Sequence, residues 1–206
     1  YLGDGIMAIF PGNADKGLQA GIDKLNEVNI YNTERKKVDR LPIDVGIGMN
    51  TGHMMVGMVG EAGRMQGDAF SDEVNLTARI EGLTKHYSVS FIITAATKAA
   101  LTDPSRYNIR FLDNVQVKGK QKVLVLYEVY DADLPHIRSL KQESHERYEQ
   151  ALQHYYDQEF EEAQIILFDV LQKNPKDKVA WHHLIKSTQC LEEGVPENWT
   201  GATVMT

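Results

Sequence analysis

Apolar residues recur at two different spacings along the first 131 residues, one typical of strands and one typical of helices. Alternation at every second residue, or a short apolar run, is typical of strands and predicts them at residues 1–10, 42–49, 53–59, 89–94, 109–118 and 123–130. Apolar residues three or four positions apart predict helices at residues 13–31, 72–86 and 95–101. Asn13 is the predicted N-cap of the first of these helices.

Tight polar turns pair these strands as hairpins. Residues 1–10 fold back on themselves at a Gly-Asp-Gly turn, and the strand at 42–49 turns to pair with its neighbour at 53–59. The strands at 109–118 and 123–130, joined through Gly119, form a predicted closing hairpin. Residues 61–71 are too polar and glycine-rich for a strand or a helix, and the charged stretch 34–40 is a solvated loop or a helix end. Because helices interrupt antiparallel hairpins, we expect an α+β fold whose sheet carries its helices on one face.

Beyond a linker predicted at residues 132–140 the pattern becomes helical. Residues 141–193 form a predicted helical extension and residues 194–206 an irregular tail. One stretch resembles the second half of a tetratricopeptide repeat, through the spacing of Ala163, Leu167, Val170 and Pro175. Such a repeat needs neighbours to bury its faces, so we expect the extension to pack on the first 131 residues or at a dimer contact, with a protein partner as the alternative.

Composition narrows the class of protein. The chain of 206 residues is 42% hydrophobic and 25% charged, values typical of a globular protein, and its formal charge of −7 argues against a nucleic-acid coat. No apolar run approaches the roughly 18–20 residues that cross a bilayer, so we expect no membrane contact by this segment. Cys190 is the single cysteine, which excludes an internal disulfide and fits the cytoplasm. Because the sequence begins at Tyr1 rather than at a methionine, we expect it to be a piece of a longer protein. Whether that longer protein is attached to a membrane is left open.

Four segments together resemble the class III nucleotidyl cyclases in order, spacing and residue type. They are YLGDGIMAIF at 1–10, GIGMNTG at 46–52, GDAFSDEVNLTARIE at 67–81 and VKGK at 117–120. The resemblance covers residues 1–131 and implies a ferredoxin-like cyclase sheet that lacks its first strand and helices. It also implies a head-to-tail homodimer with ATP in the cleft between the copies, where the ribose 3′-oxygen attacks the α-phosphate to give cyclic AMP and pyrophosphate.

The Gly-Asp-Gly turn is the predicted metal site. Taken alone, such a turn is stabilised by the Asp side chain and needs no ligand. By resemblance, Asp4 is the family's second metal ligand and holds Mg²⁺ or Mn²⁺ near the triphosphate. Hard cations prefer oxygen ligands, and a pair of them activates the attacking hydroxyl and neutralises the leaving phosphates.

Asn75 and Arg79 are the predicted catalytic pair. They lie four residues apart on one helix and therefore project from the same face. By resemblance, Asn75 orients the ribose and Arg79 stabilises the transition state. A permanently charged guanidinium suits the charge on the reacting phosphorus centre, and an amide holds the ribose without adding charge. An isolated pair of this kind would be a solvated helix face, but the surrounding motif favours a functional role.

Asp68 and Lys118 are the predicted substrate-binding residues. Asp68 precedes Asn75 by seven residues, where adenylate cyclases of this family carry Asp or Thr to read the adenine amino group. An acceptor at that place suits the exocyclic amine of adenine and repels the carbonyl of guanine. Lys118 matches the family's phosphate-binding lysine, a point charge for the β- and γ-phosphates, and Lys120 is the competing candidate.

Two residues of the family pattern are missing. The first metal-binding Asp and the adenine-reading Lys would both precede Tyr1, so we expect the parent protein to be the enzyme and this segment alone to be inactive. A guanylate cyclase is the alternative within the same chemistry. A non-catalytic module that binds nucleotide or acts as a scaffold, with a partner-binding helical tail, is the alternative outside it.

Overall fold

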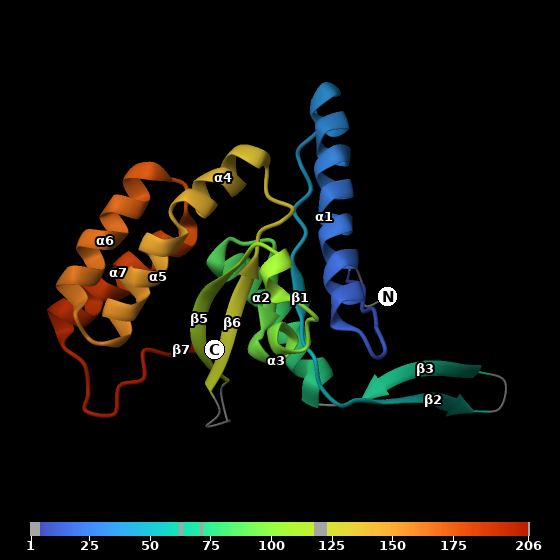
Figure 1. Cartoon of the computed structure of the whole chain (residues 1–206). Helices are drawn as coiled ribbons and strands as arrows, with labels where there is room; N and C mark the ends of the chain where they lie inside the picture. The colour runs from blue at the N-terminus through green and yellow to red at the C-terminus, as the bar shows by residue number, and fades with distance from the viewer. Residues whose placement is uncertain (1–4, 62–63, 71, 118–122, 206) are drawn as a thin grey trace.

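The computed structural model describes residues 5–61, 64–70, 72–117 and 123–205, with the side chains of all of these except 55–61, 64–70, 117 and 205. A five-stranded sheet lies at its centre (Figure 1). Its strands, in spatial order, are β1 (Ile47–Met49), β4 (Phe91–Thr94), β6 (Val123–Val129), β5 (Ile109–Val117) and β7 (Thr203–Met205). The β1–β4 and β5–β7 pairs are parallel, whereas β4–β6 and β6–β5 are antiparallel. The predicted α+β class and the predicted β5–β6 hairpin are therefore confirmed.

A separate two-stranded arm extends away from this sheet (Figure 1). It consists of β2 (Met55–Glu61) and β3 (Arg64–Phe70), paired from Met55↔Phe70 to Glu61↔Arg64. The prediction that residues 61–71 form neither strand nor helix was wrong, and so was the pairing of 42–49 with 53–59. Backbone hydrogen bonds hold a hairpin without apolar side chains, so a polar and glycine-rich composition did not exclude one.

Two helices cover opposite faces of the sheet: α1 (Ala14–Lys37) and α2 (Asp72–Tyr87). Phe91 and Ile93 of β4 pack in one cluster with α1, whereas Ile92 between them packs in another with Ile80 of α2. The prediction of helices on one face was therefore wrong. The reason lies in β4 itself, because all four of its residues are buried and a continuous apolar strand requires cover on both sides.

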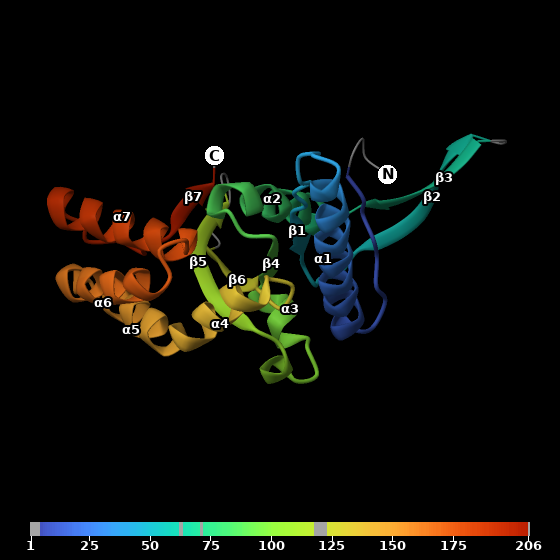
Figure 2. The same ribbon diagram turned by 90° about the horizontal axis from the view of Figure 1, so that it is seen from above.

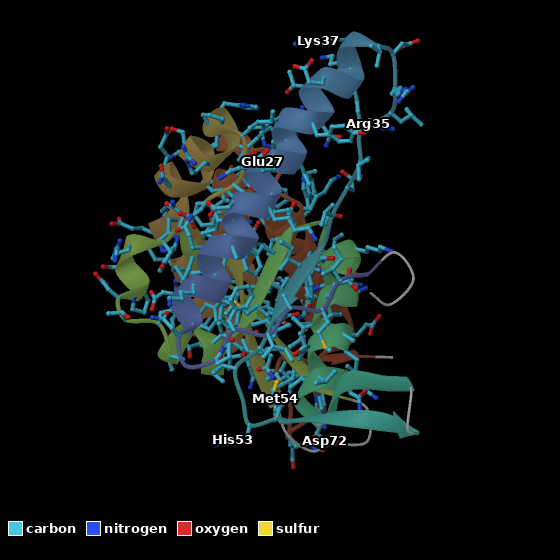
Figure 3. The ribbon with its side chains drawn as sticks, turned by 90° about the vertical axis from the view of Figure 1, so that its right-hand side faces the viewer. Glu27, Arg35, Lys37, His53, Met54 and Asp72 are labelled. Carbon is cyan, nitrogen blue, oxygen red and sulfur yellow. The ribbon has the colours of Figure 1, made fainter. Side chains whose placement is uncertain are left out.

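The helix α1 begins where the sequence predicts and ends later than predicted. Asn13 does cap the helix, its side chain accepting a hydrogen bond of 3.2 Å from the Lys16 amide, but the helix continues past Tyr31 to Lys37. Figure 3 shows Lys37 at the far end of the helix from the arm. Of the predicted hairpin at 1–10, residues 1–4 lie outside the described part, Gly5 forms an isolated bridge and residues 6–10 have no regular structure, so the hairpin stays a prediction.

The C-terminal part folds as four consecutive helices and a final strand. After α3 (Ala95–Ala99) and a short 3₁₀ turn at Pro104–Arg106, the helices are α4 (Pro135–Glu143), α5 (His145–Tyr156), α6 (Phe160–Lys173) and α7 (Lys178–Glu193). The predicted linker at 132–140 contains the start of α4, because Pro135 occupies the first helical turn, where its missing N–H is no loss. The predicted irregular tail at 194–206 instead ends in β7, which adds to the sheet.

The helical segment and the sheet share one hydrophobic core. Leu112 and Leu126 of the sheet pack in the same cluster as Tyr148, Leu167 and Leu184 of α5, α6 and α7. Viewed from above, α1 and the α5–α7 segment lie on either side of the central strands (Figure 2). Packing within the chain, one of the two arrangements expected for this segment, is what the structure shows. Within the described residues, no helix combines the length and the apolar composition needed to span a bilayer.

Candidate active site

The predicted catalytic pair lies on the outer face of α2. The inner face of this helix is buried through Ile80, Thr84 and Tyr87, whereas Asn75 and Arg79 are exposed on the other side. Neither Asn75 nor Arg79 makes a side-chain hydrogen bond or an ion pair with any part of the chain that the structure describes. Their amide and guanidinium groups are therefore open to a ligand, and their common face follows from the four-residue spacing.

Glycines in β1 and just before it allow α2 to approach the sheet closely. A Cβ added at Gly48 would lie 2.4 Å from the Glu81 amide nitrogen and 2.9 Å from the Thr77 carbonyl oxygen. A Cβ at Gly46 would lie 2.1 Å from the Thr84 hydroxyl. Real Cβ atoms do not approach other atoms this closely, so these two glycines fix the distance of α2, and with it Asn75 and Arg79, from the sheet.

A hydrogen-bonded clamp holds the first turn of α2. Asn50, which directly follows β1, donates from its amide to the Glu73 carboxylate at 2.5 Å and accepts from the Thr94 hydroxyl at 2.8 Å. Glu73 stands two residues before Asn75, so the clamp orients the start of the helix that carries the predicted pair. Sequence reasoning missed Asn50 and Glu73 as positioning residues, although both belong to the segments that carry the cyclase resemblance.

The other predicted site residues are less fully placed. Asp68 lies in β3 with its backbone opposite Gly57, on the arm that leads into α2, and its side chain is outside the described part. Figure 3 shows Asp72, the first residue of α2, at the base of this arm. Asp4 and Lys118, like the competing Lys120, lie outside the described residues. The structure thus brings Asn75 and Arg79 together and leaves the remaining assignments as predictions.

The described residues do not offer a metal centre. No group of three or more His, Cys, Asp or Glu side chains that could hold an ion occurs among them. The single predicted ligand, Asp4, is outside that part of the chain, so the metal site stays a prediction.

Comparison with known proteins assigns the family. Residues 17–129 match the adenylate and guanylate cyclase catalytic domain, a match that covers more than half of the chain and includes β1, α2 and the β5–β6 hairpin. The chain belongs to this family. The exposed pair on α2 is therefore part of a cyclase catalytic domain, and the resemblance inferred from the four sequence segments is confirmed.

Two adenylate cyclases that are similar to this chain are much longer than it. The chain is 39% identical over 137 residues to the adenylate cyclase of Anabaena cylindrica, covering 63% of this chain and 27% of that protein. It is 36% identical over 172 residues to the terminal-differentiation specific adenylate cyclase of Dictyostelium discoideum, covering 79% of this chain and 8% of that protein. The chain thus spans about a quarter or less of the length of these relatives.

The second of these similarities extends beyond the cyclase domain. A span of 79% of 206 residues is about 163 residues, so it cannot end before about residue 163, within α6. The helices α4 and α5 are therefore inside the region of similarity. Among solved structures, the crystal structure of the guanylyl cyclase Cya2 is similar with a TM-score of 0.52 and 26% identity, covering 64% of this chain and 65% of that one.

Proposed function

We propose that this chain is the catalytic part of an adenylate cyclase, which converts ATP into 3′,5′-cyclic AMP and pyrophosphate. The observation that carries the proposal is the pair Asn75 and Arg79, exposed on one face of α2 within a cyclase catalytic domain and unpaired in the described part of the chain. The names of the relatives from Anabaena cylindrica and Dictyostelium discoideum support the choice of ATP as substrate.

The reaction is an intramolecular displacement at the α-phosphorus. The ribose 3′-oxygen forms the new bond to phosphorus, the bond from phosphorus to the oxygen that bridges to the β-phosphate breaks, and the hydroxyl proton passes to solvent. Arg79 donates to the phosphoryl oxygens on which negative charge accumulates in the transition state. Asn75 binds the ribose and keeps the 3′-oxygen in line with the leaving group, which turns a random encounter into a positioned one.

Three further residues belong to the proposal. Asp68 accepts a hydrogen bond from the adenine amine, and Lys118 neutralises the β- and γ-phosphates. Asp4 is the proposed ligand of a divalent ion, Mg²⁺ or Mn²⁺, since members of this family generally use such ions. When bound, the ion supplies positive charge next to the triphosphate.

A homodimer is the proposed assembly. Asp4 of one copy and Asp68, Asn75 and Arg79 of the other form each site, and a two-fold axis then generates two equivalent sites. The requirement for both halves explains why one chain encodes residues that act on opposite ends of the nucleotide. The segment is proposed to act in the cytoplasm, where ATP is available.

Cyclic nucleotide formation by the intact protein tests the function. With ATP, Arg79→Ala should lower kcat by at least about 100-fold, since it removes charge stabilisation from the transition state, and Asn75→Ala should act in the same direction. Lys85→Ala is the matched control, because Lys85 is an exposed cation on the same helix, and it should leave kcat unchanged. Cyclisation that survives Arg79→Ala would overturn the assignment.

Two comparisons separate the alternatives. The similarity to the guanylyl cyclase Cya2 makes GTP the second candidate substrate, and competition between ATP and GTP decides between them. Mixing the inactive Asp4→Ala and Asn75→Ala proteins tests the shared site, because each mixed pair regains one of its two sites. No recovery on mixing would rule out the proposed dimer, and no product from either nucleotide would favour a binding module.

A further inference from the structure

Asp113 is a buried carboxylate with an unusually large number of donors. It lies on β5 at the irregularity in register between Phe111 and Asp113, and it is 0% exposed. Hydroxyl and ammonium groups from four other elements donate to its two oxygens: Tyr87 at 2.8 Å, Tyr156 at 3.1 Å, Lys186 at 3.0 and 3.1 Å, and Thr203 at 2.6 Å. The Asn114 amide at 2.9 Å and His182 Nε2 at 3.6 Å complete the surroundings of this carboxylate.

These donors come from parts of the chain that are far apart in sequence. Tyr87 is the last residue of α2, the helix that carries Asn75 and Arg79. Tyr156 ends α5, Lys186 lies in α7 and Thr203 begins β7. Asp113 therefore joins the helix of the catalytic pair directly to the C-terminal helices and to the last strand.

The carboxylate remains ionised in this interior. Burial acts to raise the pKa of Asp113, but the nearby imidazoles of His182 and His183, the charge of Lys186 and the hydrogen bond from Thr203 hold it well below its usual range. A buried charge depends on all of its donors, because removal of one leaves a lone pair without water or protein to replace it. The loss of one donor is therefore expected to shift the groups that remain.

Asp113 and its donors, called the junction below, are also connected to the end of β5, the strand that leads to the predicted phosphate-binding lysine. β7 pairs with β5 in parallel at Val115↔Thr203, Gln116↔Val204 and Val117↔Met205. These pairs end at the residue before Lys118. Lys186 binds the Gly201 carbonyl and the Thr203 hydroxyl, each at 3.0 Å, as well as Asp113, so α7 holds β7 on this edge of the sheet.

We propose that Asp113 is a positioning residue of the cyclase site, through which the C-terminal helices and β7 set the placement of α2 and of the end of β5. The inference rests on the proposed function, because it assigns α2 to the transition state and the end of β5 to the phosphates. It gives the helical extension a role within the chain itself. The extension supports α2 at its C-terminal end, whereas the Asn50–Glu73 clamp holds its first turn.

Two conservative variants test the two branches of the junction. Tyr87→Phe removes one hydroxyl from the carboxylate at the end of α2 and is expected to lower kcat about tenfold with little change in KM for the nucleotide. Thr203→Val removes the hydroxyl of β7 and is expected to raise KM about tenfold with a smaller change in kcat. A purely structural role would lower the melting temperature of the intact protein without this separation between kcat and KM.

Matched controls are available for both variants. Tyr155→Phe removes a buried tyrosine hydroxyl whose single hydrogen bond among the described residues is with the Cys190 sulfur, at 4.0 Å. Thr200→Val changes an exposed threonine of the same tail, whose hydroxyl accepts only from the Ala202 amide within that part of the chain. Both controls should leave kcat and KM unchanged.

Hydrogen exchange provides a readout that does not depend on catalysis. In Thr203→Val, the amides of residues 84–87 at the end of α2 should exchange about tenfold faster than in Thr200→Val, although Thr203 is not part of that helix. Equal exchange in the two variants, or kinetic losses that follow thermal stability alone, would overturn the inference. If the unsubstituted protein forms no cyclic nucleotide, the proposed function fails. The exchange comparison alone then decides whether β7 is coupled to the end of α2 through Asp113.

Discussion

Arg110 on β5 and Asp177, the N-cap of α7, form a buried bidentate ion pair. Arg110 Nη1 lies 2.6 Å from Asp177 Oδ2 and Nη2 lies 2.9 Å from Oδ1, with the two side chains 1% and 0% exposed. Glu128 of β6 accepts from Arg110 Nε at 2.6 Å and from Lys141 of α4 at 2.6 Å. The sheet is thus joined to α4 and α7 by charges as well as by apolar packing.

Replacement of Asp177 by Asn should destabilise the protein strongly. Asn still accepts hydrogen bonds as the N-cap of α7, as Asp177 does from the Val179 and Ala180 amides, so the change removes chiefly the charge opposite Arg110. Removing one carboxylate partner from a buried guanidinium lowers the free energy of unfolding by about 3–5 kcal/mol. The free energy of unfolding, measured in urea at pH 7, checks this value.

The exposed pair Arg147–Asp169 is the control for this experiment. Its atoms approach to the same 2.6 Å, but its side chains are 46% and 47% exposed, so Asp169→Asn should cost less than about 1 kcal/mol. If Asp177→Asn and Asp169→Asn had equal effects on unfolding, the buried network would not stabilise the junction between the sheet and the helices.

Gly48→Ala should displace α2 and lower cyclase activity. The new methyl group would meet the backbone of Glu81 at 2.4 Å, and backbone atoms do not yield as the end of a flexible side chain does. We expect kcat to fall at least about tenfold, because a shift of α2 misplaces Asn75 and Arg79. Gly82→Ala on the same helix is the control: it meets nothing within 4 Å and should stabilise the helix by up to about 1 kcal/mol without a loss of activity. Equal activity in the two variants would contradict the close approach of β1 and α2.

Local patterns predicted the elements whose signals are contained in a few neighbouring residues. Asn13 caps α1 as expected, and the β5–β6 hairpin joins two strands that are adjacent in sequence. The parallel pairing of β1 with β4 and of β5 with β7 involves partners far apart in the chain, and no local pattern encodes it. The arm was missed for a different reason: its two strands are adjacent in sequence, but backbone pairing rather than apolar side chains makes them.

The candidate site shows the same division. Helical spacing placed Asn75 and Arg79 on one face, and the cyclase resemblance gave them roles, so this pair was predictable from the sequence. Asp113 and Arg110 were not, because a charged residue in a strand is expected to face water unless its partners are known. Their partners Asp177 and Lys186 lie more than sixty residues further along the chain.

Trp199 should hold the tail against the helical segment. Its ring packs edge-on against Tyr155 at 5.3 Å and Phe160 at 5.5 Å between centroids. Trp199→Ala should lower the free energy of unfolding by about 2 kcal/mol and expose residues 194–206 to proteases, since aromatic packing and buried area are both lost. Trp181→Ala removes an indole that is 40% exposed and serves as the control, which should leave proteolysis of the tail unchanged. Equal rates of cleavage of the tail in the two variants would contradict an anchoring role for Trp199.

Stability should fall as the pH decreases from 7 to 5, because His183 is buried in its neutral form. Its Nε2 lies 2.7 Å from the Leu112 carbonyl oxygen, and burial lowers the pKa of His183 from 6.5 to about 4, a shift that Asp113 opposes and Lys186 and His182 assist. The unfolded chain binds a proton below pH 6.5 and the folded chain does not, so the stabilisation is complete above that pH and is lost on the way down to pH 4. About 2 kcal/mol of unfolding free energy should disappear between pH 7 and pH 5. His183→Gln, which retains a donor for Leu112, should remove most of this dependence in urea titrations at the two pH values, and an unchanged slope in that variant would assign the effect to another group.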